Sequence, residues 1–223
     1  MLVIDELIRT RRRTLSISVE DDGRLVVRAP MRLANRRILD FVKSKHAWII
    51  NRQALVQARI WRYQPKRFVV GEQFLFLGDS YPLEIKDSQS RPLVFDGSFR
   101  LARTALPRAG AAFERWYRRQ ALKVISERVD WYAAAHGFAH NGIHITSARK
   151  QWGSCGPQGD LRFAWRLIMA PLPILDYIVV HELVHLKHHN HSKRFWAAVK
   201  SILPDFEGRD RWLKDNGFLL NLD

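Results

Sequence analysis

Residues 180–186 of the chain, Val180-His181-Glu182-Leu183-Val184-His185-Leu186, contain an H-E-x-x-H motif. Residues four apart lie on one face of a helix, so both imidazoles can reach a single ion. Zinc takes imidazole nitrogens at about 2.0–2.1 Å, a geometry that two histidines one helical turn apart can supply. Glu182 points about 100° around the helix from His181, where its carboxylate can reach a water at the metal without becoming a ligand. The motif therefore predicts a zinc site with Glu182 as its general base.

The helix that carries this motif is predicted to be buried. Pro173 is well placed in its first turn. Apolar side chains cover most of its circumference, namely Ile174, Leu175, Ile178, Val179, Val184 and Leu186. An ionised glutamate inside such a helix has a high cost in free energy unless it has a partner. A metal ion bound at the two histidines would explain why a glutamate is found at this buried position.

A catalytic zinc needs three protein ligands and one open position, so a third ligand must come from elsewhere in the chain. The segment after the helix reads Lys-His-His-Asn-His-Ser, and its Asn190 favours a turn. That turn lets the chain double back and present His191 as the third ligand. By composition His188 and His189 compete with it, and Glu207 stays open as an acidic alternative.

The sequence before the motif begins with a hairpin and two helices. Alternating apolar residues over 15–19 and a second apolar run at 25–27 flank the turn Asp22-Gly23, which indicates two paired strands. Helical spacing follows at 34–42, and Ser44 can cap a second helix. This part of the chain is therefore predicted to mix strands and helices.

The middle of the chain changes from strands to a long helix. Short apolar runs over 68–102 are separated by glycine and aspartate turns, which indicates a β-rich segment. A helix is expected from 111 to 136, ended by Gly137. Strand alternation follows at 143–148 and at 161–169, and the second of these is a candidate edge that pairs with an extended substrate.

These elements predict an α+β chain in two parts. The boundary is expected near Pro107 and Gly110. The predicted domains are a basic, β-rich N-terminal region over 1–105 and a second domain over 106–223 that holds the H-E-x-x-H helix.

The charge of the chain is strongly positive and unevenly spread. Lys and Arg total 37 against 22 Asp and Glu, a net charge of +15. Residues 1–120 hold 24 basic and 12 acidic residues, and residues 121–223 hold 13 and 10. Such a field attracts polyanions through their phosphates. The densest basic cluster includes Arg11, Arg12 and Arg13, which are candidate nucleic-acid contacts or the polar side of a half-exposed hairpin.

Cysteine use and hydropathy bear on where the protein works. Cys155 is the only cysteine, so no intramolecular disulfide can form, as a reducing compartment predicts. The first residues lack the basic and apolar regions of a signal peptide, and no apolar run reaches 18 residues. The expectation is a cytoplasmic protein with no membrane partner.

Three segments of the sequence, taken together, carry a family resemblance. They are the loop Trp-Gly-Ser-Cys at 152–155, the H-E-x-x-H motif, and Asn-His-Ser-Lys-Arg-Phe-Trp at 190–196. Together they resemble the YgjP-like family of zinc metallopeptidases, which is similar in its core to the SprT and Spartan-type proteases. The resemblance covers about residues 10–215 in order of elements. It implies a minimal zincin-like domain, protein or peptide substrates, one Zn²⁺ per chain, and His191 as the third ligand.

Other residues near the motif are candidates for supporting roles. Trp152 and Gly153 are expected to shape the cleft wall. Asp176 and Asp205 are candidates to orient the ligand histidines, a role such sites usually need. Cys155 is either a reactive group or zinc ligand, or more simply a small residue that packs a tight loop.

A second function is kept beside peptide hydrolysis. The chain could be a nucleic-acid-binding module with a structural zinc, closed by His188 or Cys155 as fourth ligand. Glu182 beside His181 argues against this, because a structural site has no need of a general base. The two functions can also combine in a DNA-dependent protease. The sequence does not indicate an oligomeric state.

Overall fold

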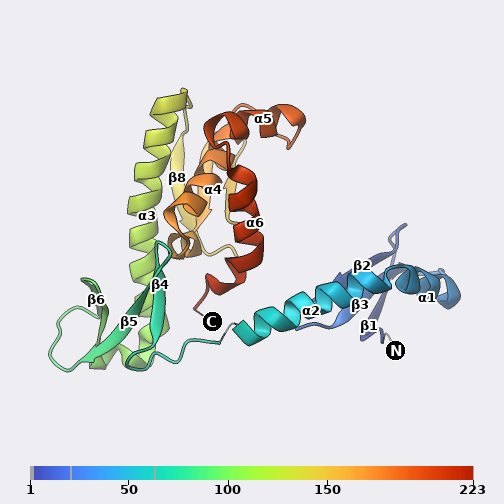
Figure 1. Cartoon of the computed structure of the whole chain (residues 1–223), viewed down its shortest axis with the longest axis horizontal. Helices are drawn as coiled ribbons and strands as arrows, with labels where there is room; N and C mark the ends of the chain where they lie inside the picture. Colours follow the sequence, from blue (N-terminus) through green and yellow to red (C-terminus); the bar gives the residue numbers. More distant parts are fainter. Residues whose placement is uncertain (1–2, 21, 63, 223) are drawn as a thin grey trace. The chain divides into compact units, whose positions relative to one another are not determined.

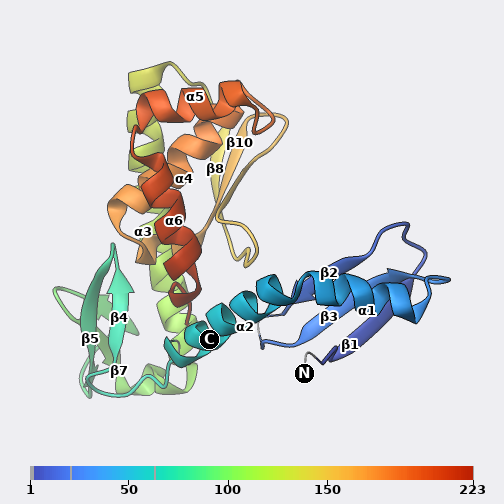
Figure 2. The ribbon, with the colours of Figure 1, turned by 45° about the vertical axis from the view of Figure 1, so that its right-hand side comes forward.

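A computed structural model of the chain describes residues 3–20, 22–62 and 64–222. Contacts divide the chain into two units, Met1–Gln64 and Pro65–Asp223, each with its own core (Figures 1 and 2). The α+β fold class predicted from the sequence is confirmed. No helix in the described part of the chain is long and apolar enough to cross a membrane.

The first unit is a small sheet with two helices. Its elements are β1 (Glu6–Thr10), β2 (Ser16–Val19), β3 (Leu25–Pro30), α1 (Asn35–Ser44) and α2 (His46–Arg62). The sheet order is β1-β3-β2, with β2 antiparallel to β3 as the hairpin pattern predicts and β1 parallel to it. Leu25, Val27 and Ala29 on β3 pack against Ile38 and Ile49 from the helices.

The second unit begins with a four-stranded sheet in the order β4-β5-β7-β6. Its strands are β4 (Gln73–Phe76), β5 (Asp79–Lys86), β6 (Leu93–Phe95) and β7 (Phe99–Ala102). A short 3₁₀ segment, η1 (Arg103–Arg108), leads into the long helix α3 (Ala109–His136). At the end of α3, Gly137 takes the left-handed conformation with φ 64°, as its position in the sequence predicts.

The four-stranded sheet shares its core with α3. The ring of Phe74 stacks on that of Phe113 with centroids 4.2 Å apart, and the Tyr117 hydroxyl donates a hydrogen bond of 2.7 Å to the carbonyl of Leu75. The contacts therefore divide the chain between Gln64 and Pro65, earlier than the 105/106 boundary expected from Pro107 and Gly110.

A second sheet follows α3 in the chain and precedes the motif helix. Its strands are β8 (Gly142–Thr146), β9 (Gly153–Cys155) and β10 (Asp160–Ala164), in the order β8-β10-β9. The helices that follow are α4 (Leu172–His185), α5 (Lys193–Ile202) and α6 (Phe206–Asn216), and α6 ends in η3 (Gly217–Leu219). Figure 1 shows α4 between α3 on one side and α6 on the other.

The strand expected over 161–169 is wrong in two respects. The strand ends at Ala164, and the next residues form a 3₁₀ segment, η2 (Trp165–Met169), whose side chains are all buried. The carbonyl groups of Ile168 and Met169 accept hydrogen bonds from the N–H groups of the turn between β4 and β5. These carbonyl groups are therefore already bonded to the four-stranded sheet. In addition β10 is the central strand of its sheet, so it cannot be the edge that pairs with a substrate.

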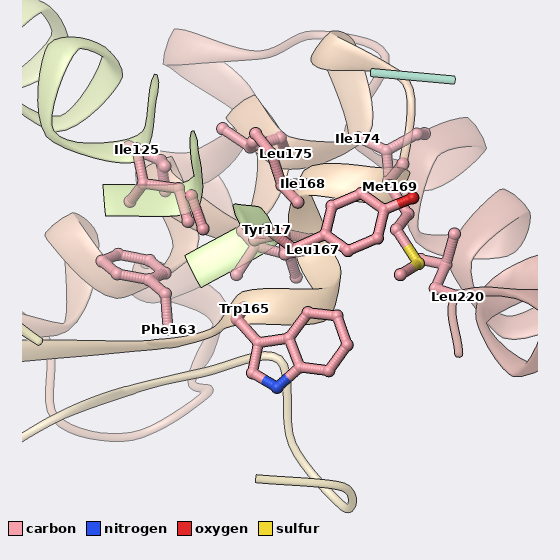
Figure 3. Packing of buried hydrophobic residues seen from close by; sticks show 14 of the residues in the cluster. Tyr117, Ile125, Phe163, Trp165, Leu167, Ile168, Met169, Ile174, Leu175 and Leu220 are labelled. Atoms are coloured by element: carbon pink, nitrogen blue, oxygen red, sulfur yellow. The ribbon is translucent and has the colours of Figure 1, made fainter. Parts of the chain in front are cut away.

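The core of the second unit surrounds η2. Trp165, Leu167 and Ile168 pack with Tyr117 from α3 and Leu175 from α4 (Figure 3). Because these side chains are fully or nearly fully buried, η2 and α4 are held firmly against α3. This packing fixes the helix that carries the H-E-x-x-H motif.

Candidate metal centre

The structure brings His181, His185 and His191 together. The Nε2 atom of His181 lies 3.2 Å from that of His185 and 3.0 Å from that of His191. In the described part of the chain, these three residues form the one group of histidine, cysteine and carboxylate side chains close enough to share a metal ion. Tetrahedral zinc with ligands at 2.0–2.1 Å separates its ligand atoms by about 3.4 Å. The three nitrogens therefore have nearly the spacing that one zinc ion requires.

Two local features place the three imidazoles. His181 and His185 are one turn apart near the C-terminal end of α4, which ends at His185. The chain then turns, with the Ser192 N–H donating to the carbonyl of Asn190 at 2.9 Å, and His191 faces back toward α4 just before α5 begins. The turn signal at Asn190 and the return of His191 are both visible in the sequence.

The backbone of the turn also orients His185. Its Nδ1 lies 3.0 Å from the carbonyl oxygen of His188. With the proton on Nδ1, His185 donates to this carbonyl and leaves the Nε2 lone pair free for a metal. His188 therefore acts through its main chain, and its side chain does not join the ligand group.

Aromatic rings from α5 enclose the histidines. Phe195 is fully buried, and its ring centroid lies 4.9, 4.6 and 4.7 Å from those of His181, His185 and His191. Trp196 contacts the rings of His181 and His191. The Phe-Trp pair of the sequence motif thus forms an apolar shell on one side of the site.

Burial favours the neutral form of the two histidines on α4, His181 and His185. It lowers the pKa of His181 to about 4, and the neighbouring His185 and His191 act in the same direction. Burial also lowers the pKa of His185. Neutral imidazoles offer a nitrogen lone pair, which is the form that binds zinc. The donor set therefore fits the ion expected from the motif.

Glu182 lies beside the triad in a tight apolar setting. Only 4% of its surface is exposed, and burial raises the pKa of its carboxyl group to about 8. Its Oε2 atom finds no hydrogen-bond partner in the described part of the chain. The side chain packs directly against Gly153 of β9, where a Cβ atom would come 2.6 Å from Oε1. Glu182 is thus held next to the three candidate ligands and lies outside their group.

A cleft of about 300 Å³ opens beside Glu182 and His181. Trp152 and Gly153, the two candidates for a cleft wall, are among the residues that line it. Its other walls come from residues that sequence reasoning did not single out, namely Tyr177, Ile178, Asp210, Leu213 and Lys214. Tyr177 is four residues before His181, so helical spacing could have placed it on the same face. For the α6 residues Asp210, Leu213 and Lys214, no pattern in the sequence indicates that they line the cleft.

The hydroxyl group of Tyr177 links the two walls of this cleft. It lies 3.3 Å from the Oδ1 atom of Asp210 on α6. Burial, with the nearby Asp210 carboxylate, raises the pKa of Tyr177, so it stays a neutral donor. This contact joins α4, which carries the ligands, to the helix on the far side of the cleft.

The other acidic candidates lie in different contacts. Asp176 accepts two hydrogen bonds from Arg128 of α3, at 2.6 and 2.9 Å, and does not touch a ligand histidine. Asp205 pairs with Arg209 at 3.0 Å on the surface of α6. Glu207 is exposed and lies outside the ligand group.

Cys155 and the N-terminal arginines also lie outside the ligand group. The thiol of Cys155 contacts the carbonyl of Gly156, and burial raises its pKa, which favours the unreactive thiol. Arg11 and Arg13 are exposed between β1 and β2, and Arg12 donates to the hydroxyl of Ser16 at 2.6 Å.

Comparisons with known proteins bear on the family of this chain. A family model described as YgjP-like, metallopeptidase domain, matches residues 13–216. The chain is 37% identical over 65 residues to the UTP pyrophosphatase of Escherichia coli (strain K12), a match that covers 29% of this chain and 39% of that protein. A likeness to the metallopeptidase zymogen of Pyrococcus abyssi abylysin covers 40% of this chain and 92% of that one, at 20% identity and a TM-score of 0.37. That likeness is too slight to carry an argument.

The family match spans nearly all of the second unit, including the histidine triad, Glu182 and the Trp152 loop. The resemblance seen in the sequence motifs is thereby confirmed. The chain belongs to the YgjP-like family of metallopeptidases.

Proposed function

We propose that this protein is a zinc peptidase in which His181, His185 and His191 hold the ion and Glu182 is the general base. The observation that carries the proposal is the convergence of three imidazole nitrogens beside a buried carboxylate. Three ligands leave one position open, which is typical of catalytic zinc. When bound, zinc supplies Lewis acidity that polarises a carbonyl group and acidifies water.

Glu182 moves the protons of the reaction. Its carboxylate accepts a proton from the attacking water and returns it to the amine that leaves. The apolar contacts around Glu182 raise its proton affinity, which suits a group that must both take and give a proton near neutral pH. Gly153 limits where the carboxylate can lie, so that its orientation is set before a substrate arrives.

The edge strand β9 is the element best placed to align a peptide. It pairs with β10 on one side, and β10 is the central strand of the sheet. Its residue Gly153 adjoins both Glu182 and the cleft. An extended peptide that adds to this edge lies beside the general base, and its side chains can enter the cleft between Trp152 and Leu213.

The absence of a fourth protein ligand supports catalysis over a structural role. Neither Cys155 nor His188 joins the ligand group in the described residues, so the site is not closed as a structural zinc site would be. This argues against the alternative of a nucleic-acid-binding module that uses zinc for folding alone.

Hydrolysis of a nucleoside triphosphate is a second candidate reaction. The E. coli relative is named a UTP pyrophosphatase, and this chain matches 39% of its length. The turn that carries His191 also lines a cavity of about 550 Å³ with Lys187, Lys193 and Arg194, whose cationic groups suit phosphates. Metal-assisted hydrolysis serves phosphoanhydrides as well as peptides.

A paired assay distinguishes the two reactions. Zinc-loaded protein is incubated with a mixed peptide library and, separately, with UTP, and the products are identified by mass spectrometry. We expect peptides to be cleaved. Cleavage should stop when a chelator removes the zinc and should return when zinc is added back. Release of pyrophosphate from UTP without cleavage of any peptide would contradict the peptidase proposal and support hydrolysis of a nucleoside triphosphate.

A further inference from the structure

A basic groove follows one face of α3, away from the metal centre. It consists of two cavities of about 430 and 450 Å³ that share Arg115 and Arg119 in their walls. One cavity extends from α3 to Arg91 and Leu93 near β6, and the other extends from α3 to β8. We call these two cavities, with Arg91, Arg115 and Arg119, the α3 groove.

The arginines of the α3 groove carry uncompensated charge. Arg91, Arg115 and Arg119 are exposed, and none of their guanidinium groups has an ion pair or hydrogen bond in the described part of the chain. Unneutralised guanidinium groups close together repel one another, so an anion bound between them relieves an unfavourable interaction. The groove therefore favours an anionic ligand.

Acidic groups nearby do not cancel this charge. Glu114 is the nearest acidic residue on α3, and it lies 3.8 Å from Arg118 and accepts a hydrogen bond from Ser147. Asp160 faces His144 at 3.7 Å. Both carboxylates are thus already occupied by other partners.

The spacing of the arginines suits a ligand that carries negative charges at regular intervals. Arg115 and Arg119 are four residues apart on α3, which places them about 6 Å apart along the helix axis. Arg91 lines the first cavity together with them. Guanidinium groups bind phosphate oxygens in a bidentate way, and a rigid helix holds them at a fixed interval. A ligand with repeated phosphates can contact several of them at once.

The edge of β8 argues against an extended peptide as the ligand. β8 pairs with β10 and lies at the outer side of its sheet. An added peptide strand would need the free carbonyl groups of this edge. Arg118 already donates to the carbonyl of Ile145 at 3.3 Å and to the hydroxyl of Ser147 at 3.0 Å, so part of the edge is blocked.

We infer that the α3 groove binds the phosphodiester backbone of a nucleic acid. The groove adjoins β8, whereas the metal centre adjoins β9 at the opposite edge of the same sheet. Nucleic acid in the groove therefore leaves the cleft beside Glu182 open. The assignment places the contact on α3 and not on Arg11 and Arg13 in the first unit.

The test is a binding titration of the full chain with a fluorescein-labelled 20-base-pair DNA duplex over a range of salt concentrations. The variant Arg91→Gln/Arg115→Gln/Arg119→Gln is compared with Arg11→Gln/Arg13→Gln/Arg32→Gln. Both remove three exposed positive charges, one set from the groove and the other from the first unit. Thermal unfolding and zinc content of each variant check that the fold is kept.

The groove variant is expected to bind the duplex about tenfold more weakly or worse, with a salt slope flatter by about 2.7 for three lost phosphate contacts. The first-unit variant is expected to stay close to the parent. Equal losses in both variants would show an effect of net charge alone, and an unchanged groove variant would rule the site out. If labelled poly-glutamate bound more strongly than the duplex, the ligand of the α3 groove would be an acidic protein and not a nucleic acid.

Discussion

Gly153 of β9 lies against the side chain of Glu182, so closely that a Cβ atom at position 153 would come 2.6 Å from both Cγ and Oε1 of the glutamate. No side chain larger than hydrogen fits there unless Glu182 or the strand moves. The position of the proposed general base thus depends on a glycine in a different element.

Gly153→Ala is expected to lower peptide turnover by about 100-fold, because displacement of a catalytic group by about 1 Å has an effect of that size. Zinc content should be unchanged, since position 153 is not among the ligands. Steady-state kinetics and metal analysis measure the two effects. Gly208→Ala is the matched control, because a Cβ there meets nothing within 4 Å. Full activity in Gly153→Ala would show that this contact does not orient Glu182.

His191→Ala is expected to weaken zinc binding by several orders of magnitude, because it leaves two protein ligands in place of three. Competition with a zinc-binding dye measures the affinity. His189→Ala is the control, since His189 is an exposed neighbour in the same turn that does not join the ligand group. If His191→Ala kept its zinc and Glu207→Ala lost it, the third ligand would be the carboxylate on α6.

Asp176→Asn is expected to lower the free energy of unfolding by about 3 kcal/mol, because it leaves Arg128 without its bidentate partner in a largely buried contact. The zinc affinity should not change, since Asp176 does not touch a ligand histidine. Denaturant unfolding and the dye competition report on the two properties separately. Loss of zinc affinity with stability retained would assign Asp176 to the metal centre after all.

Local patterns in the sequence predict the parts of the fold that depend on neighbours in the chain. The spacing of His181 and His185 and the stop at Gly137 follow from helix geometry alone, and so does the hairpin around Gly23. Alternation over 161–169 misleads because the η2 side chains are buried on every side, so the pattern no longer marks one face.

Contacts between distant segments could not be predicted in this way. The parallel pairing of β1 with β3, the approach of Gly153 to Glu182 and the wall that Leu213 adds to the cleft all join segments without a shared local pattern. Such contacts depend on how whole elements pack, and periodicity along one element carries no information about its partner.

The central claim is that Glu182 serves as the general base and not as a ligand, and peptide hydrolysis by Glu182→Gln at measured zinc occupancy tests it most directly. The amide is close in size to the carboxylate but cannot accept the proton. We expect this variant to bind one zinc per chain like the parent and to lose at least about 100-fold in turnover. A variant that hydrolyses peptides at the parent rate with zinc bound, or one that loses its zinc, would contradict the account.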